Sequence, residues 1–337
     1  MIKFSIVIIV RKINDYVKEI IFHVKNLNYS NFEVFIITDV KEEFDFGDSR
    51  FKLLLADQFS PGGKRNQGAR NATGGILAFL DDDSYPEKDW LTNAATIFAD
   101  ASIYALGGPA ATPLDAGYSE RMSGRVVESA FVSGNTTYRY IPKPKRMVDD
   151  YPSVNLFIRK DSFMSVGGFT TEFWPGEDTK LCLDLVKKYG RKFWYDPSVL
   201  VYHHRRGLLL PHLKQISRYG QHRGQFAKIF PETSRVPGYF APSAFVLGIV
   251  LGPFFCFLIP PLWNIYYWVI IVYLSVLFFE SAKVAFKEKN IIAFFEFEVA
   301  VFVTHVVYGI NFLIGLLRKP KLKLKRFDEQ TGNYVEG

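Results

Sequence analysis

The sequence predicts an α/β domain with a mainly parallel central sheet, followed by a helical membrane part. Over roughly the first hundred residues, β-branched strands alternate with helical patterns, as in a series of β-α-β units. One strand, Ile76–Leu80, runs directly into three consecutive aspartates. The 44 residues from Val236 to Phe279 contain no Asp, Glu, Lys, Arg or His, and this is twice the roughly 20 residues that a membrane-spanning helix needs.

The first half of the chain supplies four strands and two helices. Continuous β-branched runs predict strands that are covered on both faces, and apolar residues at a spacing of three and four predict helices between them. The expected strands are 4–10, 32–38, 51–55 and 76–80, and the expected helices are 14–26 and 64–72.

The second half of the domain is less regular. We expect a helix at 90–98, strands at 103–106 and 154–158, a short helix at 161–166 and a helix that opens at Glu177 and Asp178. Residues 107–150 are rich in loop-forming residues and receive no assignment.

Charge and cysteine content restrict the class of protein. The net charge is +7 and the pI about 9.1, with basic residues gathered on both sides of the apolar region. Basic flanks favour the cytoplasmic face of a membrane, and no basic-aromatic module for nucleic acid is present. Cys182 and Cys256 are too few for a disulfide framework or a cysteine metal cluster. The apolar start at residues 4–10 is too short for a signal peptide, so we expect a cytoplasmic head.

The acidic turn Asp81, Asp82 and Asp83 has two interpretations. Adjacent carboxylates repel each other, so they are either solvated or face a cation. Residues 61–72, Pro-Gly-Gly-Lys-Arg-Asn-Gln-Gly-Ala-Arg-Asn-Ala, would bring positive charge and closely approaching backbone to the same strand end. A divalent ion held by carboxylates beside such a segment suits a nucleotide diphosphate.

Two further acidic positions also allow a structural and a functional role. Thr38 and Asp39 follow a strand, where a nucleobase or ribose is gripped in open α/β sheets, yet Asp39 could equally cap the next turn. Glu177 and Asp178 open a helix, where the dipole favours negative charge. The sharper hypothesis is that a carboxylate here acts as general base toward an acceptor hydroxyl.

Taken together, these motifs resemble the family-2 inverting glycosyltransferases of GT-A fold. The resemblance rests on the order Thr38-Asp39, Arg65-Asn66-x-Gly68, Phe79-Leu-Asp-Asp-Asp-Ser84, Gly167-Gly168-Phe169, Gly176-Glu-Asp178 and Val201-Tyr-His-His204. It covers roughly residues 4 to 230, and the apolar tail is similar to that of membrane-bound members that build cell-surface glycans.

The resemblance implies a role for each matched residue. Asp178 would be the catalytic base, with Glu177 beside it, and Asp83 would be the main metal ligand, with Asp81 at the other end of the DxD motif. The implied cofactor is Mg²⁺ or Mn²⁺, because hard oxygen ligands and a diphosphate suit these ions. The implied donor is a UDP- or GDP-sugar, bound by Thr38, Asp39, Arg65, Asn66, Asp81, Asp82 and His203 or His204. Trp174, Gln215, Arg218 and Tyr219 would lie on the acceptor or product side.

Two departures from the family pattern leave alternatives open. Asp39 is followed by Val-Lys-Glu where members often have Asp-Gly-Ser, so the base-binding edge could differ. Gln215-Ile-Ser-Arg-Tyr219 is similar to the Gln-x-x-Arg-Trp motif of processive polysaccharide synthases, but Tyr219 replaces the tryptophan. The expected acceptor is a lipid-linked saccharide. The alternatives are a polyprenyl-phosphate glycosyltransferase, a processive synthase and a membrane-anchored scaffold that binds nucleotide sugars without turnover.

The C-terminal region is expected to place the enzyme at a cell (inner) membrane as a multi-pass protein. The expected divisions are a catalytic domain at 1–207, an amphipathic interfacial helix in 208–235, two or three transmembrane helices in 236–318 and a basic tail at 319–337. Three crossings would place the tail outside, but its dense Lys and Arg favour the cytoplasm. We therefore predict a cytoplasmic tail and one apolar segment that does not cross.

Overall fold

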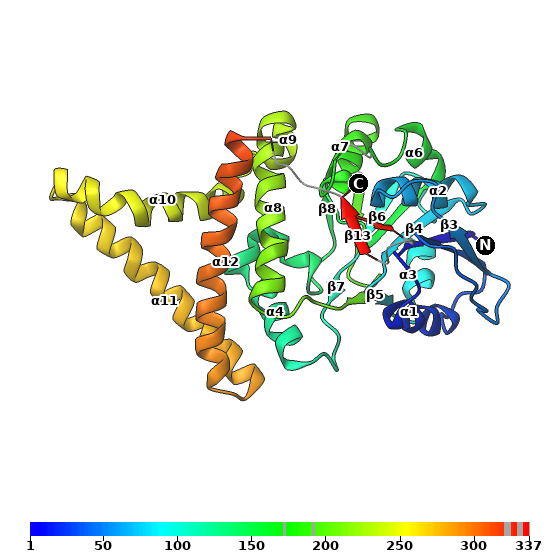
Figure 1. Ribbon diagram of the computed structural model, residues 1–337, viewed down its shortest axis with the longest axis horizontal. Helices are drawn as coiled ribbons and strands as arrows, with labels where there is room; N and C mark the ends of the chain where they lie inside the picture. The colour runs from blue at the N-terminus through cyan, green and yellow to red at the C-terminus, as the bar shows by residue number, and fades with distance from the viewer. Residues whose placement is uncertain (171–172, 191–192, 320–324, 329–332, 337) are drawn as a thin grey trace. The chain divides into compact units, whose positions relative to one another are not determined.

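The computed structural model describes residues 1–170, 173–190, 193–319, 325–328 and 333–336 (Figure 1). Its contacts divide the chain into two compact units. The first contains Met1–Pro113 and Tyr138–His204, together with the hairpin of β12 (Lys325–Asp328) and β13 (Asn333–Glu336). The second contains Leu114–Thr137 and the helices that begin after Arg205. The two units therefore interleave along the sequence. The expected divisions after residues 207, 235 and 318 stay predictions.

An eight-stranded sheet forms the centre of the first unit, in the order β3-β2-β1-β4-β9-β6-β10-β8. The strands β1 to β4 are parallel, as predicted, whereas β9 is antiparallel to β4 and β6, and β8 is antiparallel to β10. A smaller sheet joins β5, β11 and β7. The strands are β1 (Phe4–Ile9), β2 (Phe32–Thr38), β3 (Phe51–Leu55), β4 (Ile76–Asp81), β5 (Ser84–Pro86), β6 (Ala105–Gly107), β7 (Ala110–Ala111), β8 (Arg146–Val148), β9 (Asn155–Arg159), β10 (Phe193–Tyr195) and β11 (Val201–His203).

Helices cover both faces of this sheet, so its strands are apolar on both sides. Helices α1 (Asp15–Lys25) and α3 (Trp90–Ile97) pack on one face against Phe4, Ile6 and Ile8. Helices α2 (Pro61–Asn71), α6 (Lys160–Ser165) and α7 (Glu177–Tyr189) lie over the other face. Figure 1 shows the two helical layers below and above the sheet. The continuous apolar strands seen in the sequence are explained by this double cover.

The interval that we left unassigned contains defined structure. Besides β7 and β8 it holds α4 (Tyr118–Glu128), α5 (Ala130–Ser133) and a 3-10 helix (Gly134–Arg139). The loop-rich interpretation of residues 107–150 was therefore wrong. Strands of two or three residues carry too little alternation to be recognised, and α4 is rich in charge because it pairs with acidic residues far along the chain.

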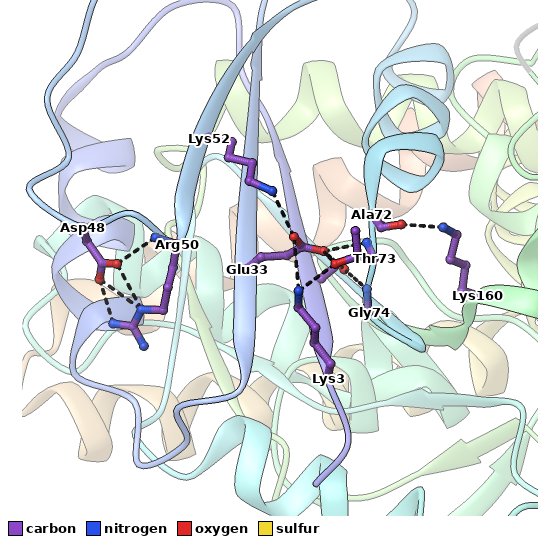
Figure 2. Close-up of polar contacts among 10 residues, drawn as sticks. Lys3, Glu33, Asp48, Arg50, Lys52, Ala72, Thr73, Gly74 and Lys160 are labelled. Carbon is purple, nitrogen blue, oxygen red and sulfur yellow. Dashed lines mark hydrogen bonds and ion pairs between the residues drawn. The ribbon is translucent and has the colours of Figure 1, made fainter.

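A buried carboxylate ties the N-terminal ends of three strands together, at the sheet edge opposite the acidic turn. Glu33 of β2 accepts hydrogen bonds from the Ser5 hydroxyl (2.8 Å) and the Thr73 amide (2.6 Å), and Lys52 and Lys3 lie 3.2 and 3.6 Å away (Figure 2). Burial opposes ionisation, but these hydrogen bonds outweigh it and lower the pKa of Glu33 to about 2.

We expect Glu33→Gln to destabilise the protein by about 2 to 3 kcal/mol at pH 7, the linkage value for a carboxyl whose folded pKa lies that far below its unfolded one. Because the folded pKa is depressed, this stability is fully present above about pH 4.5 and is lost as the pH falls toward 2. Thermal unfolding in detergent micelles measures both effects. Asp15→Asn, at an exposed ion pair with Lys18, is the control and should change little.

The second unit is helical. It contains α4 and α5, then α8 (Leu210–Ile229), α9 (Pro231–Ser234), α10 (Pro237–Leu258), α11 (Leu262–Glu288) and α12 (Ile292–Leu317). The last three are long and apolar enough to cross a membrane. All three lie within 236–318, where membrane helices are expected, and the Pro260-Pro261 pair separates α10 from α11. Most of the basic tail lies outside the described residues.

Candidate active site

The acidic residues meet at the C-terminal edge of the parallel strands. Strand β1 lies between β2 and β4, with Ile9 opposite both Ile37 and Asp81. Thr38 ends β2 and Asp81 ends β4, so Asp39 and the acidic turn follow neighbouring parallel strands. This is the position at which open α/β sheets bind ligands.

Helix α2 contributes two buried cations to this edge. It begins at Pro61 with Ser60 as its N-cap, and the Ser60 hydroxyl accepts from the Gly63 amide at 3.0 Å. Close packing of α2 on the sheet requires glycine at position 68, because a Cβ there would lie 2.5 Å from a Val7 methyl group. The glycines of this segment thus permit close helix packing in addition to any approach to a ligand.

Lys64 is paired with Asp39. Its Nζ lies 2.8 Å from Asp39 Oδ1, and both side chains are almost fully buried. Burial lowers the pKa of Lys64, against the opposing attraction of Asp39. Lys64 was not among the predicted site residues. Its position beside Arg65 in the basic segment is the sequence feature that could have indicated it. Asp39 is held in position by this pair, while Thr38 donates its hydroxyl proton to the Val40 carbonyl (2.8 Å).

Arg65 connects the acidic turn to the start of α7. Its Nη2 donates to Asp81 Oδ1 at 2.7 Å and its Nη1 to Glu177 Oε1 at 3.2 Å, with only 4% of the residue exposed. Despite burial, the nearby carboxylates Asp81, Glu177 and Asp178 raise the pKa of Arg65. The guanidinium is therefore a fixed internal cation that positions two parts of the site.

The two carboxylates that open α7 differ in environment. Glu177 is buried, accepts from the Gly176 amide at 3.0 Å and faces Arg65. Burial and then the proximity of Asp178 raise the pKa of Glu177 to about 7, against the opposing effect of Arg65. Asp178 is half-buried and its Oδ1 accepts from the Thr179 amide at 2.8 Å. Asp178 is thus the more accessible of the pair.

The small sheet decides between the two candidate histidines. Strand β11 pairs with β5, which follows the acidic turn, and His203 Nε2 lies 3.1 Å from Asp83 Oδ1. The His204 side chain instead reaches Glu19 Oε2 on α1 at 2.9 Å and packs against Tyr16. The structure therefore brings the His203 side chain to the Asp83 carboxylate, whereas His204 donates its backbone amide to the Asp83 carbonyl at 2.9 Å and turns its side chain to Glu19.

Asp83 and His203 form a donor set that suits a small divalent ion. Among the described residues no cluster of three His, Cys, Asp or Glu side chains is close enough to hold a metal with protein groups alone. Mg²⁺ and similar ions in nucleotide sites need only one or two protein ligands, since water and substrate phosphates complete the shell. The Oδ1 of Asp81 is engaged by Arg65, which leaves Asp83 as the better placed carboxylate.

The other predicted site residues are distributed between the two units. The Asn66 amide group exchanges two 2.8 Å hydrogen bonds with the Phe169 backbone, so it supports the site rather than lining it. Asp82 and Trp174 are half-buried in the first unit. Gln215, Arg218 and Tyr219 lie on α8 in the second unit, where Gln215 Nε2 donates to the Tyr219 hydroxyl at 3.1 Å.

We expect Arg65→Met to lower the stability of the protein by about 3 to 5 kcal/mol, because it removes the buried cation that pairs with both Asp81 and Glu177. Adding Glu177→Gln should restore part of the loss, and thermal unfolding of the four proteins of this cycle measures the coupling. Arg70→Met is the matched control on the same helix, since its pair with Asp57 is about half exposed on both sides. Equal losses for Arg65→Met and Arg70→Met would contradict the assigned role.

Comparisons with known proteins concern the family and the fold of the first unit. Residues 5–167 match the model of glycosyl transferase family 2. A pre-mycofactocin glycosyltransferase of Mycobacterium tuberculosis is 28% identical over 172 residues, which is 51% of this chain and 36% of the relative. A glucosyl-dolichyl phosphate glucuronosyltransferase of Haloferax volcanii is 24% identical over 191 residues, which is 52% of this chain and 60% of the relative.

A solved structure supports the fold. The mannosyltransferase PcManGT from Pyrobaculum calidifontis, in complex with GDP-Man and Mn²⁺, aligns with a TM-score of 0.53 and 15% identity, covering 93% of this chain and 86% of that one. The segment 5–167 of the first unit therefore matches glycosyl transferase family 2. The fold is that of GT-A enzymes, and three helices long and apolar enough to cross a membrane lie in the C-terminal part of the described chain. The resemblance found in the sequence is thereby confirmed.

Proposed function

We propose that this protein is a membrane-bound, metal-dependent inverting glycosyltransferase that moves a sugar from a nucleotide-sugar donor to a lipid-linked saccharide. The main support is the meeting of Asp39, Asp81, Asp83, Glu177 and His203 at one edge of the sheet, from four separate segments. A single buried residue, Arg65, joins the acidic turn to the start of α7. Such a concentration of carboxylates suits a cation and a diphosphate.

Asp83 and His203 are the residues that would hold the metal ion. A divalent cation bound there would offset the negative charge that develops on the departing diphosphate. Mn²⁺ and Mg²⁺ both accept a carboxylate, an imidazole and phosphate oxygens, so the donor set does not select one of them. The Mn²⁺ present with GDP-Man in the PcManGT structure is consistent with this choice.

Asp178 is the proposed catalytic base. It would accept the proton of the acceptor hydroxyl as the oxygen attacks the anomeric carbon, while the bond from that carbon to the diphosphate oxygen breaks and its electron pair leaves with the diphosphate. Attack opposite the leaving group inverts the configuration. Glu177 has a pKa near that of an effective base, but it is buried against Arg65 and is better suited to fix the geometry.

Relatives indicate the classes of donor and acceptor. PcManGT was solved with GDP-Man, and the Haloferax volcanii relative is named for transfer to glucosyl-dolichyl phosphate. The proposed donor is a nucleotide-diphosphate sugar, bound in part by Asp39. The proposed acceptor is a saccharide on a polyprenyl lipid, in agreement with the names of these two proteins. The apolar helices of the second unit would keep the enzyme at the membrane where such an acceptor resides.

The test is a panel of labelled nucleotide sugars incubated with membranes that contain the protein and with extracted lipid-linked acceptors. We expect one donor and acceptor pair to give a product that is absent from control membranes without the protein. Chain-length analysis of the product separates single addition from processive synthesis. Donor binding without any product would overturn the proposal in favour of a nucleotide-sugar-binding scaffold.

A further inference from the structure

Helices α8 and α12 run side by side in the same direction (Figure 1). His212 Nε2 lies 3.0 Å from the Thr304 hydroxyl, and farther along both helices the Ser217 hydroxyl donates to Asn311 Oδ1 at 2.9 Å. Residue numbers increase together along the contact, which therefore follows most of the 20 residues of α8. Two helices in such contact must share one orientation relative to the membrane.

Glycines bring these two helices into backbone contact. A Cβ added to Gly224 would lie 2.1 Å from the Phe312 carbonyl oxygen, and one added to Gly315 would lie 2.0 Å from the Gln221 carbonyl oxygen. The Gln221 side chain also donates to Asn311 Oδ1 at 2.7 Å. Small residues and polar side chains at this interface resist separation of the two helices. Helix α12 therefore has the same orientation relative to the membrane as α8.

Helix α8 is too polar to cross a bilayer. It carries Lys214, Gln215, Arg218, Gln221, His222, Arg223, Gln225 and Lys228 within its 20 residues. A basic side chain at the centre of a membrane is destabilising even on the most lenient insertion scale. By contrast, basic residues are favourable beside anionic headgroups. The shared orientation of the pair is therefore set by α8, along the membrane surface.

The exposed surface of α12 is an apolar stripe on one side. Its members are Phe295, Val299, Phe302, Ile310, Ile314 and Leu317, at helical spacings of three, four or eight residues. The other faces of α12 pack against α8 and against Met122 and Val126 of α4. They also contact the beginning of α10 and the end of α11. One apolar stripe opposite polar neighbours is the pattern of a helix that lies in the interface.

The polar groups of α12 are satisfied from the side of α4 and α5. Tyr118 donates to Glu296 at 2.6 Å, and His305 Nε2 lies 3.1 Å from the Phe131 carbonyl oxygen. At the end of α11, Glu288 accepts from Arg121 and Arg125. An aqueous or headgroup environment on this side is consistent with so many charged and hydroxyl groups.

Helices α10 and α11 differ from α12 because most side chains of their far halves are exposed, apart from the side on which the two helices contact each other. Contacts of α10 with α12 come from its first half, where Phe240 packs on Phe312, Ser243 donates to the Gly309 carbonyl and Phe245 packs near Phe302. Beyond it, α10 and α11 form a hairpin that projects away from α12 (Figure 1). The 22 residues of α10 are about 33 Å long at 1.5 Å per residue, enough to span the hydrocarbon core.

The tip of this hairpin carries no charge. Pro260 and Pro261 form the turn, and Trp263, Tyr266, Tyr267 and Trp268 follow at the start of α11. Tryptophan and tyrosine gather at membrane interfaces. The tip is thus suited to the far interface of the bilayer.

We propose that only α10 and α11 cross the bilayer, and that α12 lies in the headgroup region with its apolar stripe toward the lipid and with α4 and α8 on its aqueous side. The partner of this surface is an anionic phospholipid leaflet, matched by the basic residues of α8 and by Arg235. The chain then crosses twice, so both of its ends lie on the same side. This inference concerns membrane placement and does not depend on the proposed reaction.

Depth measurements test the proposal directly. Single cysteines are placed at Phe295, Phe302, Ile310 and Leu317 of α12 in the full chain with Cys182→Ser and Cys256→Ala, spin-labelled, and reconstituted in nanodiscs with anionic lipid. We expect all four α12 labels to report one shallow depth, although the sites extend over about 33 Å of helix at 1.5 Å per residue. Labels at Ile265, Val269, Val272 and Phe279 of α11 are the control and should change steadily in depth.

A depth profile on α12 that reaches the bilayer centre, with its two ends at opposite faces, would overturn the proposal. A second measurement avoids any substitution of buried cysteines. Tags fused to the two ends of the unmodified chain should be digested by external protease together or be protected together in sealed vesicles. Digestion of one tag with protection of the other would mean an odd number of crossings and would equally overturn the proposal.

Discussion

Replacing Asp178 by asparagine should lower kcat for sugar transfer by about 10² to 10⁴-fold, the usual contribution of a general base, and leave donor binding nearly unchanged. The amide keeps the size of the side chain and its contact with the Thr179 amide, but it cannot accept the proton of the acceptor. Initial rates with the donor and acceptor pair found in the panel, together with donor affinity by calorimetry, measure the two effects separately.

Asp184→Asn is the matched control for this change, because Asp184 lies on the same helix and pairs with Lys180 at its surface. It should leave kcat unchanged. If Asp178→Asn also retains its rate, the acceptor does not need a base, and a polyprenyl phosphate oxygen would be the nucleophile instead. If Glu177→Gln alone removes the activity while the protein stays folded, the base would be reassigned to Glu177.

Removal of divalent metal should reduce transfer to the background rate, since the diphosphate would then face the aspartates without a counter-charge. Excess chelator should stop the reaction and added Mn²⁺ or Mg²⁺ should restore it. Asp83→Asn should raise the metal concentration needed for half-maximal activity, because it removes the proposed carboxylate ligand beside His203. Activity assayed over a metal titration measures this shift.

Asp48→Asn is the control for the metal titration, because Asp48 pairs with Arg50 at the opposite edge of the sheet (Figure 2). It should leave the titration unchanged. Full activity in excess chelator would remove the metal from the proposed reaction. An unchanged metal requirement in the Asp83 variant would show that Asp83 is not a ligand.

Much of the first unit could be predicted because its strands are covered on both faces. The mostly apolar runs at 32–38 and 51–55 coincide with β2 and β3, since strands of a covered parallel sheet are largely apolar. The later strands could not be predicted because β6, β8 and β10 have only three residues each. Their pairing depends on partners distant in the sequence, which a local pattern does not contain.

The site was predictable in its residue types but not in its pairings. Aspartates that follow a strand are visible in the sequence, and the role of the acidic turn stays a prediction. The choice between His203 and His204 needed the pairing of β11 with β5. The placement of Arg65 between Asp81 and Glu177 needed the fold as well, because residues 65 and 177 are far apart in the chain.

The interleaved order of the two units has a consequence for synthesis on the ribosome. Helix α4 emerges early, yet its partners Glu288 and Glu296 belong to the last helices to be made. Until then, Met122 and Val126 have no apolar surface from α12 to cover them. During synthesis, α4 therefore lacks its ion-pair and apolar partners until the last helices have been inserted into the membrane. A fragment that ends at residue 204 should aggregate. Replacing 114–137 in that fragment by a short polar linker should prevent the aggregation.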